Sequence, residues 1–162
     1  MSLYSIRPAR EQDSVEIARL AAQLGYPASA DVTRTRLLRL LASSKDAVFV
    51  AESPDGALAG WIHGVLSQFL ESEFRVEIAG LVVDERFHRK GIGRDLVQRI
   101  ETWALGHGVA QASVRCQTKR ADAHRFYASL GYTETKRQVV FRKPLSPRPE
   151  DAPQTKNRIA MS

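Results

Sequence analysis

The chain has 162 residues, of which 43% are hydrophobic, and this is enough apolar material for one ordinary domain with its own core. Cys116 is the only cysteine, which excludes an intramolecular disulfide and a cysteine-based zinc cluster. Because no apolar run reaches membrane-spanning length, we expect a cytoplasmic protein without metal or membrane partner. The net charge of +6 suits a polyanionic partner such as a phosphate-rich cofactor, but the basic residues are spread along the chain and are weak grounds for nucleic acid.

The first part of the chain predicts one strand and two helices. Residues 3–9 read as a short strand that Pro8 ends, and apolar residues then recur at helical spacing over residues 11–24. A Tyr-Pro pair at 26–27 breaks the chain. Asp31 is the expected N-cap of the second helix, whose apolar residues extend to Leu41.

The middle of the chain predicts a hairpin and a buried strand. The turn sequence Ser-Pro-Asp-Gly at 53–56 lies between two apolar runs, which favours a β-hairpin. FRVEIAGLVV, residues 74–83, is nearly continuous in apolar character and rich in β-branched residues, so we expect a strand buried on both faces.

The last part predicts two more helices and two more strands. Apolar residues recur at helical spacing from Gly91 to the glycines at 106 and 108, and a strand, a helix and a last strand follow at 109–116, 121–132 and 138–145. The order β-α-α-β-β-β-α-β-α-β indicates one α/β (α+β) domain over residues 1–145. Residues 146–162 are polar and proline-rich, and we expect them to form a C-terminal tail.

The stretch HRKGIGRDLV, residues 88–97, places two glycines between basic side chains and the start of a helix. A helix N-terminus exposes unpaired N–H groups and the positive end of the helix dipole, and glycine lets a large anion approach them. This pattern favours a pyrophosphate cradle. The alternative is a tight strand-to-helix turn in which the glycines serve packing, and neither a P-loop nor G-x-G-x-x-G is present.

Two motifs resemble those of the GNAT superfamily of N-acetyltransferases. GLVVDERFHRKGIGRDLV is similar to its apolar strand followed by [RQ]-x-x-G-x-[GA], and KRADAHRFYASLGY is similar to its R-x-x-A-H-x-F-Y-x-x-x-G-[YF] segment. The resemblance covers roughly residues 3–143 and implies a single GNAT-like domain with a central mixed, mostly antiparallel sheet flanked by about four helices. Two departures are His88, where the family usually has Arg or Gln, and Gln117, where it often has Asn.

The resemblance implies acetyl-CoA as co-substrate. Its pantetheine amides would pair with the buried strand as an added strand does, and its pyrophosphate would lie on the glycine turn. The cofactor-binding residues implied in this way are Leu81, Val82, Val83, His88, Arg89, Lys90, Gly91, Ile92, Gly93, Arg94, Gln117, Arg120, Ala123, Phe126 and Tyr127.

The resemblance also implies direct attack of an acceptor amine on the thioester, without a protein nucleophile. Glu77, the only acidic residue inside the apolar strand, is the candidate base; the alternative is an ion pair with Arg75 or another cation. Tyr127 would stand near the CoA sulfur as a catalytic hydrogen-bond donor, or else be a core aromatic. Tyr26 and His63 are candidates for acceptor binding, although His63 could instead pack in the hairpin.

The leading hypothesis is an acetyl-CoA-dependent N-acetyltransferase acting on a primary amine of a small molecule or of a peptide or protein. The alternatives are a non-catalytic acyl-CoA-binding or sensing module and a basic RNA-binding domain, which lacks support because aromatic residues make up only 7% of the chain. The last strand or the tail could join two copies into a homodimer.

Overall fold

A computed structural model describes residues 3–146, so the predicted tail lies outside the described residues except for Ser146. The elements in chain order are β1 (Ser5–Pro8), the 3-10 helix η1 (Glu11–Asp13), α1 (Ser14–Gln23), α2 (Ala30–Leu41), β2 (Asp46–Glu52), β3 (Leu58–Phe69), β4 (Ser72–Val83), the 3-10 helix η2 (Glu85–Phe87), α3 (Ile92–Gly106), β5 (Ala112–Val114) and α4 (Ala121–Ser129). No helix in this part of the chain is long and apolar enough to cross a membrane.

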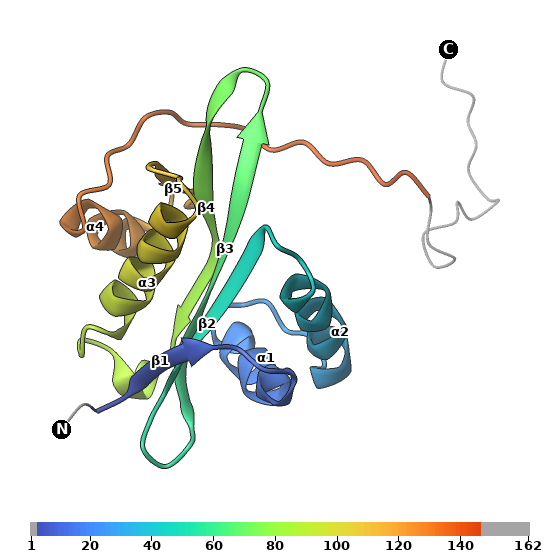
Figure 1. Cartoon of the computed structure of the whole chain (residues 1–162), viewed down its shortest axis with the longest axis vertical. Helices are drawn as coiled ribbons and strands as arrows, with labels where there is room; N and C mark the ends of the chain where they lie inside the picture. Colours follow the sequence, from blue (N-terminus) through green and yellow to red (C-terminus); the bar gives the residue numbers. More distant parts are fainter. Residues whose placement is uncertain (1–2, 147–162) are drawn as a thin grey trace.

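The strands form one mixed sheet in the order β1-β2-β3-β4-β5. The first three pairings are antiparallel and the pairing of β4 with β5 is parallel, which confirms the predicted mostly antiparallel sheet. Figure 1 shows α1 and α2 on one side of this sheet and α3 and α4 on the other. The sheet therefore separates two layers of helices, and each layer has its own apolar contacts.

The larger core lies between the sheet and α3. Leu96 and Ile100 of α3 are fully buried, and they pack in one cluster with Ile62 of β3 and Val76 of β4. Gly64 of β3 allows this close packing, because a Cβ at that position would lie only 2.7 Å from Ile100 Cδ1. The helix that follows the glycine turn is thus fixed against the centre of the sheet.

The smaller core lies on the other face of the sheet, under α1 and α2. It contains Leu20 and Leu37 from these helices and Val50 and Val82 from the strands. The predicted N-cap of α2 was wrong: the cap is Ser29, whose hydroxyl accepts a hydrogen bond from the Val32 N–H at 3.1 Å. Asp31 lies instead in the first turn, where its negative carboxylate interacts favourably with the positive end of the helix dipole.

The predicted last strand is also wrong for the described structure. Residues 138–145 form no strand, and the side chains of Val139, Val140, Phe141 and Leu145 are between 65% and 91% exposed. A strand needs a partner backbone, and none of the five strands of the described sheet pairs with residues 138–145. Apolar composition alone therefore did not decide the structure of this segment.

Candidate active site

β4 separates from β5 halfway along its length. β5 pairs only with residues 76–78 of β4, and beyond them the register with β3 changes from Gly64 opposite Ile78 to His63 opposite Gly80. Ala79 is therefore an extra residue on β4, a β-bulge that bends the strand. The bulge leaves the second half of β4 without a partner on its β5 side within the described residues.

The open side of β4 presents backbone groups that could bind an extended ligand. The Asp84 N–H donates to the Ala59 carbonyl on β3, so the polar groups of residue 84 face β3. Because these groups alternate in direction along a strand, those of Leu81 and Val83 face away from β3. This edge matches the place predicted for the pantetheine amides.

The glycine turn joins β4 to α3 in the predicted place. Gly91 is the N-cap of α3 and has a φ of 80°, in the left-handed region that favours glycine, and Arg89 has a φ of 63°. The first N–H groups of α3 have no carbonyl of their own helix to bind, so they are available to an anion. The residues present fit a pyrophosphate.

His88, the atypical residue of the motif, has its side chain at the end of β4. Its Nε2–H donates a hydrogen bond to the Val83 carbonyl at 3.0 Å. Because this nitrogen binds a backbone carbonyl, His88 contributes to the cradle by holding the turn against the strand. Arg89 and Arg94 are the arginines of the turn that line the cavity.

A buried carboxylate ties the beginning of the turn to α1. Asp84 is fully buried, and it accepts hydrogen bonds from Arg86 Nη2 at 2.8 Å and from Arg19 Nη1 at 3.1 Å. The hydrogen bond from Arg86 is the main cause that holds the pKa of Asp84 well below its ordinary value. The carboxylate therefore stays charged and fixes η2, which leads into the cradle.

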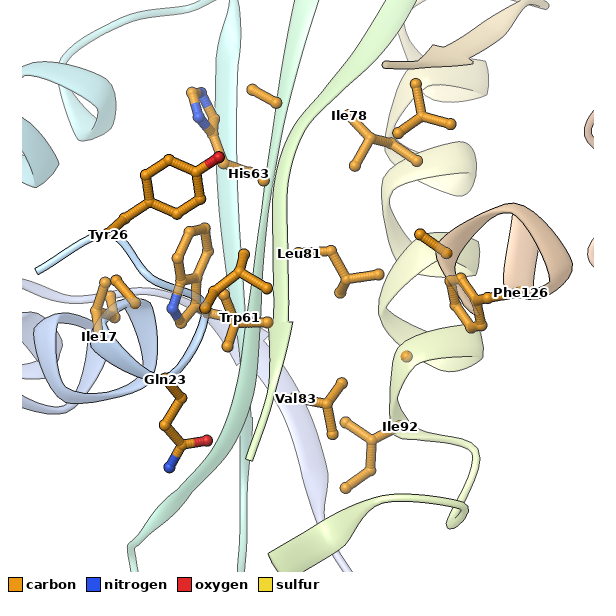
Figure 2. Close-up of a pocket in the computed structure, with 18 of the residues that line it drawn as sticks. Ile17, Gln23, Tyr26, Trp61, His63, Ile78, Leu81, Val83, Ile92 and Phe126 are labelled. Carbon is orange, nitrogen blue, oxygen red and sulfur yellow. The ribbon is translucent and has the colours of Figure 1, made fainter. Parts of the chain in front are cut away.

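One cavity of about 1020 Å³ extends over both faces of the sheet. Figure 2 shows Tyr26, Trp61 and His63 on one side of the strands and Leu81, Val83 and Phe126 on the other. We call these the acceptor half and the CoA half. The cavity includes Ala79 and Gly80 of the bulge, so the two halves meet where β4 and β5 separate.

All but two of the predicted site residues line this cavity. Those that do are Tyr26, His63, Leu81, Val82, Val83, His88, Arg89, Gly91, Ile92, Gly93, Arg94, Gln117, Arg120, Ala123, Phe126 and Tyr127. Lys90 is outside it, with Nζ over the Phe87 ring at 5.3 Å from the centroid. Glu77 is the other exception.

Glu77 is paired with a cation, as the alternative interpretation of the sequence foresaw, but the partner is not Arg75. Arg115 Nε lies 2.8 Å from Glu77 Oε1, whereas the Arg75 guanidinium lies over the Phe69 ring. Glu77 is opposite Val65 in the ladder, which places it on the same face of the sheet as His63. The structure thus brings Glu77 to the face of His63 without bringing it to the cavity wall.

The CoA half contains the predicted tyrosine and the single cysteine. Burial raises the pKa of the Tyr127 phenol, so this hydroxyl keeps its proton, and no hydrogen bond from it is recorded in residues 3–146. Burial also raises the pKa of Cys116, which lines the cavity and remains a thiol at neutral pH. The site therefore offers a free hydrogen-bond donor and no activated nucleophile.

The acceptor half combines the predicted His63 with residues that the sequence did not single out. His63 Nε2 lies 2.7 Å from Asp46 Oδ1, and Trp61 lines the same cavity. Alternation along β3 places residues 61 and 63 on one face, and this signal could have linked Trp61 to His63. Gln23 of α1 and Arg36 and Thr33 of α2 are further polar residues that line the cavity.

Comparison with known proteins agrees with this arrangement. The family model of the acetyltransferase (GNAT) family matches residues 15–132. An aminoglycoside N(6')-acetyltransferase type 1 from Stenotrophomonas maltophilia is 29% identical over 158 residues, which covers 90% of this chain and 97% of that protein.

Solved structures share the fold. The aminoglycoside antibiotic 6'-N-acetyltransferase AAC(6')-Ih from Acinetobacter baumannii has a TM-score of 0.78 at 20% identity, with 88% of this chain and 99% of that chain covered. AAC(6')-Iy in complex with the bisubstrate analogue CoA-S-monomethyl-acetylneamine gives the same TM-score, identity and coverage.

The bulged strand with its open edge, the glycine turn at the start of α3 and the cavity across both faces of the sheet fit the binding of an acyl-CoA. The chain belongs to the GNAT acetyltransferase family. It is an N-acetyltransferase that uses acetyl-CoA as co-substrate, and the leading hypothesis from the sequence is confirmed over the non-catalytic module.

Proposed function

We propose that the acceptor is a primary amine carried by a small molecule that enters the acceptor half of the cavity. The cavity of about 1020 Å³ supports this, because it has room for a compact acceptor beside the end of a CoA thioester. The relative from Stenotrophomonas maltophilia is named an aminoglycoside N(6')-acetyltransferase, which makes aminoglycosides the first acceptors to test.

The residues of the CoA half have separate tasks in this proposal. Acetyl-CoA supplies an activated acetyl group as a thioester. Leu81 and Val83 orient the pantetheine by backbone hydrogen bonds, and the N–H groups at the start of α3, with Arg89 and Arg94, bind the phosphates. Phe126 lies against this half, with its ring 4.9 Å from that of Tyr127. The predicted contributions of Ile92, Gln117, Arg120 and Ala123 rest on their positions in the same wall.

Acetyl transfer proceeds directly from sulfur to nitrogen. The amine nitrogen forms a bond to the carbonyl carbon while the bond from that carbon to sulfur breaks, and Tyr127 donates a hydrogen bond to the departing sulfur. A neutral phenol with a raised pKa is suited to donating a hydrogen bond rather than to giving up its proton. The raised pKa of Cys116 disfavours an acetyl-cysteine intermediate.

Glu77 stays a predicted base. Its position on the acceptor face of β4 supports the prediction, and its ion pair with Arg115 opposes it, since the guanidinium already uses one of its carboxylate oxygens. Substitution of Glu77 by glutamine tests its role in the same assays as the acceptor screen.

Two copies of the chain could complete the sheet. The exposed segment 138–145 has the composition of a strand, and β5 is an edge strand, so we propose a homodimer in which this segment of one copy pairs with a strand edge of the other. A cytoplasmic location would suit an enzyme that needs the cell's acetyl-CoA, and we propose it on that ground.

The acceptor class is tested by a thiol-release assay with acetyl-CoA. The panel contains neamine, spermidine, lysine, benzylamine and a short peptide with a free N-terminus. The proposal expects neamine or another small amine to release CoA well above the rate without acceptor. Turnover with the peptide alone would contradict a small-molecule acceptor.

A further inference from the structure

We propose that His63, held by Asp46, is the base that takes the proton of the acceptor amine. This inference rests on the proposed function, and it gives the task of the base to a residue that the sequence pattern associates only with acceptor binding. It depends on three features of the structure: a hydrogen bond that fixes the tautomer of the imidazole, the position of the imidazole in the cavity wall, and the charges around it.

The contact with Asp46 decides which nitrogen of His63 can act as a base. A carboxylate accepts hydrogen bonds and does not donate them, so the Nε2 of His63, 2.7 Å from Asp46 Oδ1, carries a hydrogen. In the neutral ring the lone pair is then on Nδ1. No hydrogen bond of Nδ1 is recorded within residues 3–146, so this lone pair is not used by another group of the described chain.

The pair is held firmly and next to the cavity. The side chains of His63 and Asp46 are 20% and 14% exposed, and they come from adjacent strands, with Val48 of β2 opposite His63. His63 lines the acceptor half, whereas Asp46 is not among the residues that line the cavity. Figure 2 shows Tyr26 and His63 on the same side of the strands, so both side chains belong to the acceptor half.

Glu77, the competing candidate, is less suited to this task. It does not line the cavity, and Arg115 lies 2.8 Å from its carboxylate. The guanidinium of Arg115 therefore already occupies a carboxylate oxygen that would have to take the acceptor proton. His63 has a carboxylate partner instead, which stabilises the imidazolium that forms when Nδ1 takes a proton.

The remaining charges near His63 come from several elements. Asp46 belongs to β2, Glu77 and its partner Arg115 come from β4 and from the residue after β5, and Arg36 of α2 and Tyr26 line the same half of the cavity. Asp46 is the one in direct contact with the imidazole. Removing the Asp46 carboxylate should therefore alter the ability of His63 to accept a proton more than the removal of any other single charge.

The protons balance in the proposed step. An acceptor R–NH3⁺ gives one proton to Nδ1 of His63, which passes it to solvent. The neutral amine then forms the C–N bond as the C–S bond breaks, and its second proton ends on the sulfur, so the products are the N-acetyl amine, CoA thiol and one released proton. A base must be unprotonated to accept a proton, so the step uses His63 in its neutral form.

The test compares three variants over pH 5.5 to 9.5, roughly the range in which a histidine and an amine titrate. His63→Gln keeps an amide that can donate to Asp46 but has no base, Asp46→Asn keeps the imidazole but loses the carboxylate, and Glu77→Gln removes the competing candidate. kcat/KM for neamine, or for the best acceptor of the panel, is measured at saturating acetyl-CoA. His107→Gln, at the exposed end of α3 and outside the cavity, is the matched control.

His63→Gln is expected to lower kcat/KM by about 100-fold at pH 7 and to recover as the pH approaches the pKa of the amine itself. Its Kd for CoA, measured by calorimetry, should stay within about twofold of the wild type, because the CoA half is unchanged. Asp46→Asn should lower kcat and shift the acidic limb of the pH profile, since its amide can donate to Nε2 and move the hydrogen of the ring to Nδ1.

Several results would overturn the inference. A wild-type pH profile in His63→Gln, or a loss of activity in Glu77→Gln that His63→Gln does not show, would assign the base elsewhere. If His63→Gln fails to bind CoA, Asp46→Asn becomes the deciding variant. An acidic limb of its pH profile that matches the wild type would then contradict the proposal. Failure of the wild type to acetylate any amine would instead contradict the proposed function.

Discussion

Tyr127 is a buried phenol whose hydroxyl points to no protein partner in the described chain and whose ring forms part of the CoA half. A buried hydroxyl without a hydrogen-bond partner costs free energy, so a bound ligand that accepts its hydrogen bond is favoured. We therefore assign its hydroxyl to the sulfur that leaves during transfer.

Tyr127→Phe should lower kcat by roughly 10- to 100-fold, the effect of losing one hydrogen bond to a charged atom, while KM for acetyl-CoA changes little. Stability should hardly change, because the hydroxyl has no recorded protein partner. Steady-state kinetics and thermal unfolding measure the two effects separately.

Tyr132 provides the matched control for this substitution. Its hydroxyl donates to Glu101 Oε1 at 2.8 Å, and it lies outside the cavity. Tyr132→Phe should keep kcat and lose a little stability. Equal kcat values for Tyr127→Phe and the wild type would remove Tyr127 from the mechanism.

At this scale the sequence can nominate the residues that a local motif carries, but it cannot specify the contacts that only the fold brings together. Gly91 and Tyr127 belong to motifs in which neighbours along the chain share one task. The contact between His63 and Asp46 depends instead on the register of β2 with β3, and the partner of Glu77 is Arg115 from beyond another strand. Nothing in the spacing of these residues along the chain specifies the contacts.

Among the elements, the turn between β4 and α3 controls the geometry of the phosphate site. Gly91→Ala places a Cβ on a residue with a φ of 80°, and that Cβ would lie 3.1 Å from the Arg94 guanidinium. The left-handed conformation costs a non-glycine residue about 1 to 2 kcal/mol. We expect KM for acetyl-CoA to rise by about fivefold or more, because the start of α3 must shift.

Gly106→Ala is the control for this change. Gly106 ends α3, has no positive φ, and an added Cβ would meet nothing within 4 Å. KM for acetyl-CoA should stay the same and the unfolding temperature should stay the same or rise. If both variants raised KM alike, the effect would belong to the helix and not to the cradle.

The Asp84 side chain connects η2 to α1, and removal of its carboxylate should lower the stability of the fold. Asp84→Asn leaves two guanidinium groups without their buried partner, and we expect it to lower the free energy of unfolding by about 2 kcal/mol at pH 7. Urea unfolding measures this. Glu134→Gln, which breaks the exposed pair with Arg137, should change it by less than about 1 kcal/mol.

The same carboxylate gives the stability a pH dependence of known sign. The pKa of Asp84 is lower in the folded chain than in the unfolded chain, so its contribution is present above an unfolded pKa of about 3.9 and is lost as the pH falls below it. The difference between wild type and Asp84→Asn should therefore persist from pH 7 to about pH 5 and shrink at lower pH. A constant difference down to pH 3 would contradict this assignment.

Element types were predictable where periodicity and packing agree. Ile92, Leu96 and Ile100 recur at helical spacing and are buried together in α3. The start of α2 and the last strand were not, for different physical reasons. Serine and aspartate are both good N-caps, so Ser29 and Asp31 compete, and a strand at 138–145 requires a partner edge that local sequence cannot supply.

For the whole molecule, the exposed apolar segment leads to a prediction about assembly. If segment 138–145 pairs with a second copy, light scattering after size exclusion should give the mass of a dimer. Phe141→Asp, at a side chain that is 90% exposed, should shift the protein toward monomer. Leu105→Asp, at an exposed apolar residue of α3, should leave the dimer intact. A monomeric wild type would contradict the proposed assembly.

The fold also explains how one cavity serves two substrates. The bulge at Ala79 ends the pairing of β4 with β5, and this opening connects the CoA half, with Tyr127, to the acceptor half, with His63. In the proposed mechanism the donor and the acceptor approach the same point from opposite faces of the sheet. This arrangement needs no covalent intermediate on the protein, since the amine can reach the thioester directly.

The most direct test of this function is the release of CoA thiol from acetyl-CoA in the presence of neamine, spermidine, lysine, benzylamine or a short peptide, with the acetylated product identified by mass spectrometry. The structure predicts acceptor-dependent thiol release and one added acetyl group on the nitrogen of a small amine. Tight binding of CoA without turnover of any amine in the panel would contradict it.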